Sequence, residues 1–193
     1  GDIFVRDLQA GTTTLVSINR QGTAGGRGGE SYEPQISADG RFVIFTSYAT
    51  DLVENYTAGD QGLFIRDLLA GTTTLVVSGV NCNIIVNKQQ VGVHPADSRC
   101  EVRDYGPLIS ADGHYLAFTT QTPLASNDDG NISCYLRDLY TGTYSLISVN
   151  YAGATATGSS GALGISADGR FVLFVSDASD IAPQQSSKFY SGA

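Results

Sequence analysis

The sequence predicts an all-β fold made of β-propeller blades, and internal repeats are the main reason. The phrase Ile-Ser-Ala-Asp-Gly occurs three times, starting at Ile36, Ile109 and Ile165. Two other phrases alternate with it: Arg-Asp-Leu at 6–8, 66–68 and 137–139, and Gly-Thr at 11–12, 71–72 and 142–143. Such self-similarity is the signature of repeat architectures. Each period holds four short apolar runs separated by turn residues, which is typical of a four-stranded antiparallel blade.

The first two runs of a period are joined by Asp-Gly, a strong hairpin signal because glycine tolerates positive φ. In the first full copy the opening run covers 34–37 and the second covers 42–45. The second run is continuously apolar, which indicates a strand buried on both faces. We therefore expect Phe45, Phe118 and Phe174, at matching positions, to be core aromatics.

The third run, 63–65, leads into Arg-Asp-Leu and a turn with glycine, and the fourth, 72–76, is rich in β-branched residues that suit a pleated surface. The steps from Arg6 to Arg66 and from Arg66 to Arg137 are 60 and 71 residues. Both exceed the roughly 40–50 residues of compact propeller blades, so we expect long loops.

The two ends of the chain read as halves of one blade. Residues 1–17 match strands three and four, and residues 163–193 begin with strands one and two. Counted from Arg137 through position 193 and on to Arg6, the step is 62 residues, between the other two steps. We predict three four-stranded blade equivalents: full blades at 34–78 and 107–148, and one blade split between the termini.

These repeats resemble the TolB-like, WD40-like β-propeller repeats of large bacterial exported proteins. The residues that carry the resemblance are Ile-Ser-Ala-Asp-Gly-Arg-Phe-Val, Ile-Phe-Val-Arg-Asp-Leu and Gly-Thr-Thr-Thr-Leu-Val-Ser. It covers nearly all of the chain except 79–106 and the last dozen residues. The resemblance implies the fold and export from the cell, but it does not imply one activity.

Residues 79–106 are an insertion that contains Cys82 and Cys100, 18 positions apart. A disulfide between them would stabilise the fold by about 3 kcal/mol and would favour an oxidising compartment. We therefore predict a disulfide-pinned insertion. Cys134 aligns with Ile3 and Leu63, so we expect it to be a small buried apolar residue.

Charge limits the partners. The net charge is −8 and the pI is about 4.5, which argues against nucleic acid and against anionic membrane surfaces. No apolar run approaches the roughly 20 residues of a membrane span. We expect an extracellular or cell-surface location, with the periplasm as the alternative.

One loop partly matches an acidic pattern of the resembled family that suits calcium. Asn127, Asp128 and Asp129 are its candidate ligands, and a solvated Asn-Asp-Asp-Gly turn is the alternative. We expect no other cofactor. Asn55 and Asn131 begin glycosylation sequons, which arise easily by chance in a chain rich in Ser and Thr.

The sequence offers no catalytic constellation. The Arg-Asp pair recurs in every blade, which indicates a structural role. There is no Gly-x-Ser-x-Gly elbow, and the four glutamates lie in loops of different blades. We therefore predict a protein that is not an enzyme, with a propeller glycosidase or lyase as the least favoured alternative.

A split blade exposes unpaired strand edges, and such edges pair with other chains. We predict a structural or adhesive module that assembles head to tail with further copies of itself, as a ring or a fibre, or as one period of a tandem polypeptide. A propeller that binds a glycan or a peptide is the alternative. The predicted assembly residues are Gly1, Ile3, Val5, Leu15, Ile165, Phe171 and Leu173.

Overall fold

The computed structural model describes residues 1–56, 61–78, 106–126, 128 and 130–182, together with the backbone of 85–86 and 89–90. Every regular element in these residues is a β-strand. None of the described segments forms a helix that could cross a membrane. The all-β prediction is confirmed.

The first full blade is one antiparallel sheet in sequence order. Its strands are β3 (Ser31–Ile36), β4 (Phe42–Ser47), β5 (Gly62–Asp67) and β6 (Thr72–Ser78). The first strand starts at Ser31, three residues before the predicted start at Pro34, because a bulge between Tyr32 and Gln35 lets the pairing continue.

The second full blade repeats this topology. Its strands are β9 (Leu108–Ile109), β10 (Tyr115–Thr120), β11 (Ser133–Asp138) and β12 (Tyr144–Leu146). Between the two blades the backbone of β7 (Ile85–Val86) pairs with that of β8 (Gln89–Gln90). This extra strand pair falls within the insertion 79–106.

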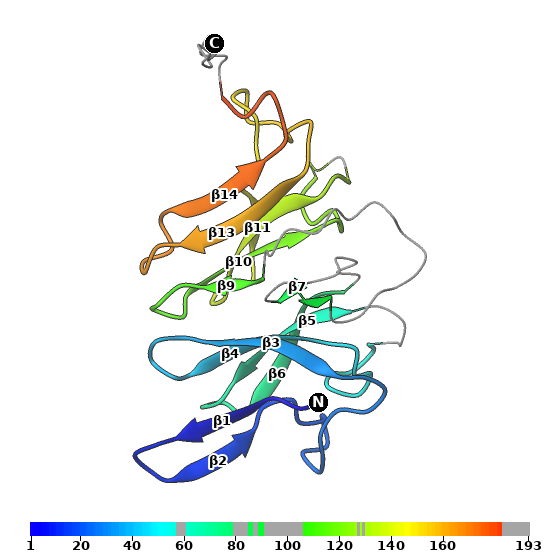
Figure 1. Cartoon of the computed structure of the whole chain (residues 1–193), viewed down its shortest axis with the longest axis vertical. Coiled ribbons are helices and arrows are strands. Elements are labelled where there is room, and N and C mark those ends of the chain that lie inside the picture. Colours follow the sequence, from blue (N-terminus) through cyan, green and yellow to red (C-terminus); the bar gives the residue numbers. More distant parts are fainter. Residues whose placement is uncertain are drawn as a thin grey trace.

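The two halves of the split blade lie at opposite ends of the molecule (Figure 1). One half is β1 (Phe4–Asp7) paired with β2 (Thr12–Leu15), and the other is β13 (Ser160–Ile165) paired with β14 (Val172–Ser176). The four sheets form a fan in the order β1–β2, β3–β6, β9–β12 and β13–β14 (Figure 1). First strands of successive blades meet, since β3 contacts β9 and β9 contacts β13.

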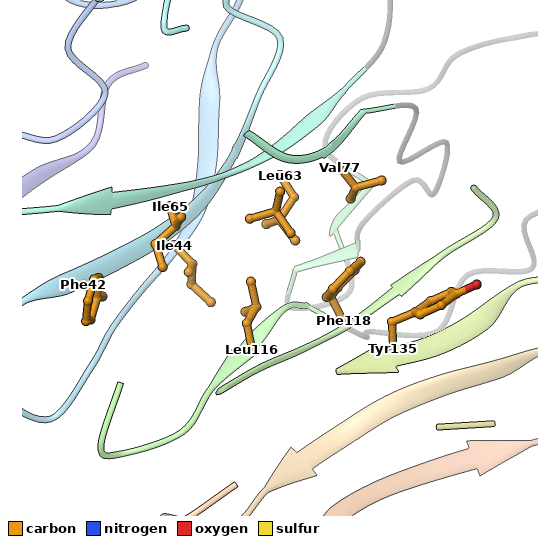
Figure 2. Packing of buried hydrophobic residues seen from close by; sticks show 9 residues of the cluster. Phe42, Ile44, Leu63, Ile65, Val77, Leu116, Phe118 and Tyr135 are labelled. Carbon is orange, nitrogen blue, oxygen red and sulfur yellow. The ribbon is translucent and has the colours of Figure 1, made fainter. Parts of the chain in front are cut away.

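The core lies between the blades rather than inside any of them. Between the full blades, Ile44 of β4 faces Leu116 of β10, and Phe118 and Tyr135 complete the contact (Figure 2). Equivalent clusters join β1–β2 to the first full blade and the second full blade to β13–β14. Each full blade therefore uses both faces, one toward the preceding sheet and one toward the next.

Burial of the second strand depends on these neighbours. All six residues of β4 are buried, and the rings of Phe45 and Phe118 are 0% and 1% exposed. No residue of β14 is buried, and Phe174 is only partly covered. The expectation that Phe174 is a core aromatic is therefore wrong for a single copy, because among the described residues no third strand pairs with β14 and no sheet covers its outer face.

We expect Phe45→Ala and Phe118→Ala each to lower the free energy of unfolding by about 3–5 kcal/mol, because each removes a fully buried ring. Phe174→Ala should cost less than either in an isolated copy. Urea denaturation of the three variants at high dilution measures the difference. A loss at Phe174 as large as that at Phe45 would contradict the burial pattern.

Candidate functional site: the two open halves of the split blade

The Ser-Ala-Asp-Gly hairpin is held by the same three polar contacts in each copy. In the first, Ser37 Oγ donates to Asp39 Oδ1 at 2.5 Å and accepts from the amide of Phe42 at 2.9 Å, while the amide of Arg41 donates to Asp39 at 3.0 Å. The copies at 110–115 and 166–171 have the same contacts. The hydrogen bond from the serine is the main cause that lowers the pKa of Asp39, Asp112 and Asp168.

The recurrent Arg-Asp pair builds the turn between strands three and four. Asp67 Oδ1 accepts from the amides of Leu69 and Ala70, both at 2.9 Å, and Arg66 donates to the hydroxyl of Thr73 at 3.1 Å. The pairs at 6–7 and 137–138 form matching contacts. These contacts support the structural role predicted for the Arg-Asp pair.

A second tie joins strand two to strand three in the full blades. Arg41 forms a salt bridge with Asp67 at 2.7 Å, and it is the main cause that lowers the pKa of that carboxyl. In the second blade His114 lies 3.4 Å from Asp138. The corresponding residues of the split blade are Arg170 and Asp7, which lie on separate sheets at the two ends of the chain.

The full blades also define the register that the split blade would have. Phe42 pairs with Asp67 and Phe45 with Phe64 in the first blade. In the second blade, Tyr115 pairs with Asp138 and Phe118 with Tyr135. Carried to the split blade through the repeat phrases, this register places Phe171 opposite Asp7, Val172 opposite Arg6 and Phe174 opposite Phe4.

Cross-strand aromatic pairs show what the halves lack. The rings of Phe45 and Phe64 stack with centroids 5.8 Å apart, and those of Phe118 and Tyr135 stack at 6.1 Å. Phe64 and Tyr135 are each 0% exposed. The equivalent third-strand ring, Phe4, is 61% exposed, and its expected stacking partner, Phe174, is at the other end of the fan.

Exposed apolar side chains gather on both halves. Phe171, just before β14, is 63% exposed and Leu173 of β14 is 64% exposed, whereas Phe42, at the position of Phe171, is 9% exposed. On the other half, Leu8 is 90% exposed, while the matching Leu68 packs against the core. These residues define the candidate interaction surface of the two halves.

The predicted assembly residues divide into two groups. Phe171, just before β14, and Leu173, in β14, are both exposed. The others are covered, at least in part, by contacts within the chain. Ile3 and Val5 pack against the first full blade, and Ile165 packs against the second. Leu15 is partly buried and pairs with Phe4. The Gly1 carbonyl accepts from the amide of Ser31 at 3.1 Å.

Sequence reasoning missed Phe4 and Leu8, although strand alternation contained the signal. Ile3 is directed toward β2, since its amide donates to Ser17 Oγ and its carbonyl accepts from Val16. The backbone groups of the next residue, Phe4, therefore point to the free edge of β1. Its side chain lies on the face of the sheet opposite to that of Ile3. An edge of this kind is a template for another strand.

The calcium prediction rests mostly on residues outside the described part, since only Asp128 of its three candidates is placed. Its carboxylate accepts from the hydroxyl of Tyr135 and, at 2.9 Å, from the amide of Gly130. Burial, followed by this hydrogen bond, raises the pKa of Tyr135 to about 12. Within the described residues no cluster of three His, Cys, Asp or Glu side chains is placed to hold a metal.

Cys82 and Cys100 also lie outside the described residues, so the disulfide stays a prediction. Cys134 is a free thiol with no exposed surface, and burial raises its pKa to about 12, which confirms its predicted place in the core. Of the sequon residues, Asn55 is exposed with a φ of 59°, and Asn131 is partly buried.

Comparison with known proteins places the fold. No protein-family model and no curated protein matches the chain. Among solved structures, the tricorn protease matches over 91% of this chain and 13% of its own, with 11% identity and a TM-score of 0.53. TolB from Acinetobacter baumannii matches over 91% of this chain and 32% of its own, with 17% identity and a TM-score of 0.49. An oligogalacturonate lyase in complex with manganese matches with 14% identity and a TM-score of 0.33, over 72% of this chain and 40% of its own.

The β-propeller fold is thus confirmed, and the chain spans a third or less of the TolB and tricorn chains. Identities this low show a shared fold and nothing about activity. The activities in those names belong to those proteins.

The hairpin and turn carboxylates predict a sensitivity to acid. Because their folded pKa values are depressed, they stabilise the fold above the unfolded-state value of about 3.9, and this stability is lost as the pH falls toward the folded values. We expect the melting temperature to be nearly constant from about pH 7 to about pH 5 and to fall below about pH 4.

The triple variant D39N/D112N/D168N serves as the control. It should melt at a lower temperature than the wild type at neutral pH, and its melting temperature should depend less on pH. Calorimetry from pH 7 to pH 2.5 would reject the idea if the two proteins showed the same pH profile.

Proposed function

We propose that the chain is a non-enzymatic structural β-propeller repeat module that assembles head to tail. In this assembly β1–β2 of one copy complete the blade that β13–β14 of another copy begin. The observation that carries the proposal is the divided aromatic pair: both full blades stack a strand-two ring on a strand-three ring, and the third pair is shared between Phe174 and Phe4 at opposite ends.

Charge and hydrogen bonding support the same join. In the derived register Arg170 would face Asp7 as Arg41 faces Asp67. The amide of Leu68 donates to the carbonyl of Arg41 at 2.8 Å. In the completed blade the amide of Leu8 would donate to the carbonyl of Arg170 in the same way. Both of these polar contacts between strands two and three of the first full blade thus have counterpart groups on the two open edges.

Apolar burial supplies the driving force. Phe4, Leu8, Phe171 and Leu173 are each more than 60% exposed in the single copy. Burying one such side chain contributes about 1.5–3 kcal/mol relative to leaving it exposed. Several of them, added to the paired edge, offset the cost of association, which is at least about 4 kcal/mol.

The number of blades bears on the shape of the assembly. One copy supplies three blade equivalents, while known propellers use about 4–8 blades. Two copies would form a six-bladed ring if the rotation closes, and a larger number would form a fibre if it does not. A tandem polypeptide would make the same join between consecutive repeats of one chain.

The structural role and an exterior location fit together. The net charge of −8 disfavours nucleic acid as a partner, and we place the module outside the cell or on its surface, with the periplasm as the alternative. Binding of a glycan or peptide through 79–106 stays a prediction, because most of that segment lies outside the described residues.

We expect the wild-type chain to sediment as a dimer or larger species at micromolar concentration, and Phe4→Pro to shift it toward the monomer. In the single copy, proline at this edge position removes a solvent-facing amide and a ring that is 61% exposed; in the assembly it removes the ring that stacks on Phe174 and blocks the new strand pairing. Analytical ultracentrifugation across a hundredfold dilution series gives the association constant.

Leu69→Ser is the matched control, because Leu69 is 81% exposed but lies in a turn of the first full blade and belongs to neither half of the split blade. It should assemble like the wild type. A wild-type chain that stays a monomer of 20.3 kDa at every concentration would refute the head-to-tail proposal.

A further inference from the structure

Successive blades share a glycine contact in addition to their apolar core. A Cβ added to Gly113 of the second blade would lie 2.9 Å from the ring of Phe42 in the first blade. A Cβ on Gly169 would clash with the ring of Tyr115 in the second blade. In both cases the hairpin glycine of one blade is covered by the ring that opens strand two of the preceding blade.

The third hairpin glycine and the third ring that opens a second strand do not meet each other in the single copy. Gly40, the hairpin glycine of the first full blade, would have no atom within 4 Å of an added Cβ. Phe171, which aligns with Phe42 and Tyr115, is 63% exposed. The chain therefore contains one uncovered glycine and one uncovered ring of the kinds that meet at its two internal junctions.

The isoleucines of the first strands show the same pattern: two are covered by the preceding blade and one is not. Ile109 packs against the core shared with the first blade, and Ile165 packs against the core shared with the second. Ile36 is the equivalent residue of the first full blade, and it is 48% exposed. Because Ile36 pairs with Val43, its side chain lies on the face that looks toward β1–β2. That face is the one where a preceding inner half-blade would pack.

We infer that a second copy binds through a face as well as an edge: Phe171 and Leu173 of one copy pack on Gly40 and Ile36 of the next. The inference rests on the proposed head-to-tail assembly and defines a second part of its interface. The copy that donates β1 also presents Gly40, because β1–β2 and the first full blade are joined by a cluster that includes Ile3 and Phe45.

Glycine is required at this contact for two reasons. Gly40 has a φ of +73°, a conformation that few other residues adopt without strain. The approach seen at Gly113 leaves no room for a Cβ beside the ring. A side chain at position 40 would therefore hold Phe171 of the other copy away from the first full blade. The single copy would lose no contact through this change.

The test compares Gly40→Asn with Gly142→Asn. Asparagine tolerates positive φ better than most residues, and Gly142 has a φ of +74° and equally open surroundings in a turn of the second blade. We expect Gly40→Asn to weaken the association constant about tenfold or more, and Gly142→Asn to leave it within about twofold of the wild type. Phe171→Ala should weaken it by about tenfold to a hundredfold.

Sedimentation measures the association constants, and melting curves at the lowest concentration show whether each variant is folded. If Gly40→Asn does not fold, Ile36→Ser replaces it, with Leu69→Ser as its control. A wild type that assembles, together with a Gly40→Asn variant that assembles equally well or is weakened no more than Gly142→Asn, would overturn the face contact and leave the head-to-tail proposal intact. A wild type that never assembles would overturn both.

Discussion

The structure depends on one constraint: a blade is a single sheet whose two faces are both apolar, so it needs a neighbour on each side. The strand β4 has a sheet on both faces and a strand on both edges, and all six of its residues are buried. The strand β14 has the same kind of sequence but one face and one edge uncovered, and none of its residues is buried. Whether a strand is buried therefore depends on the sheets and strands next to it. An apolar sequence alone does not bury it.

The polar residues that repeat serve the backbone, which explains why they recur at every blade. Ser37 and Asp39 close the first hairpin, and Asp67 caps the next turn while it also binds Arg41. Each carboxylate satisfies amides that have no partner in a strand, at a point where the chain reverses. A residue that forms these backbone contacts in every blade has a structural role. We would expect a ligand site where one blade differs from the others.

Sequence reasoning predicted the strands and their pairing, but only part of the exposed surface: Phe171 and Leu173 were among the predicted residues. The Asp-Gly hairpins and the continuous apolar run at 42–45 predict local features that each period determines by itself, and the structure has them. Phe4, Ile36 and Gly40 were missed because their importance depends on which face of a blade meets which neighbour. That relation is set by the stacking of separate sheets, and it becomes visible only when equivalent residues of three blades are compared for exposure.

The junction between the two full blades differs from the other two in a way that suits its longer connection. Asp51 accepts from the amide of Arg27 at 2.7 Å, and Asp180 accepts from that of Thr157 at 3.0 Å, so each carboxylate anchors a short loop between blades. At the equivalent position, four residues after Thr120, the second blade has Leu124, which packs against the core.

Leu124 offers no acceptor for a loop amide, and its own amide donates to the hydroxyl of Tyr135 at 3.0 Å. The carboxylate that anchors the loop at the other two junctions is therefore replaced by an apolar side chain in the blade that follows residues 79–106. Leu124 and the long connection therefore occur at the same junction, and both distinguish the second blade from the other two.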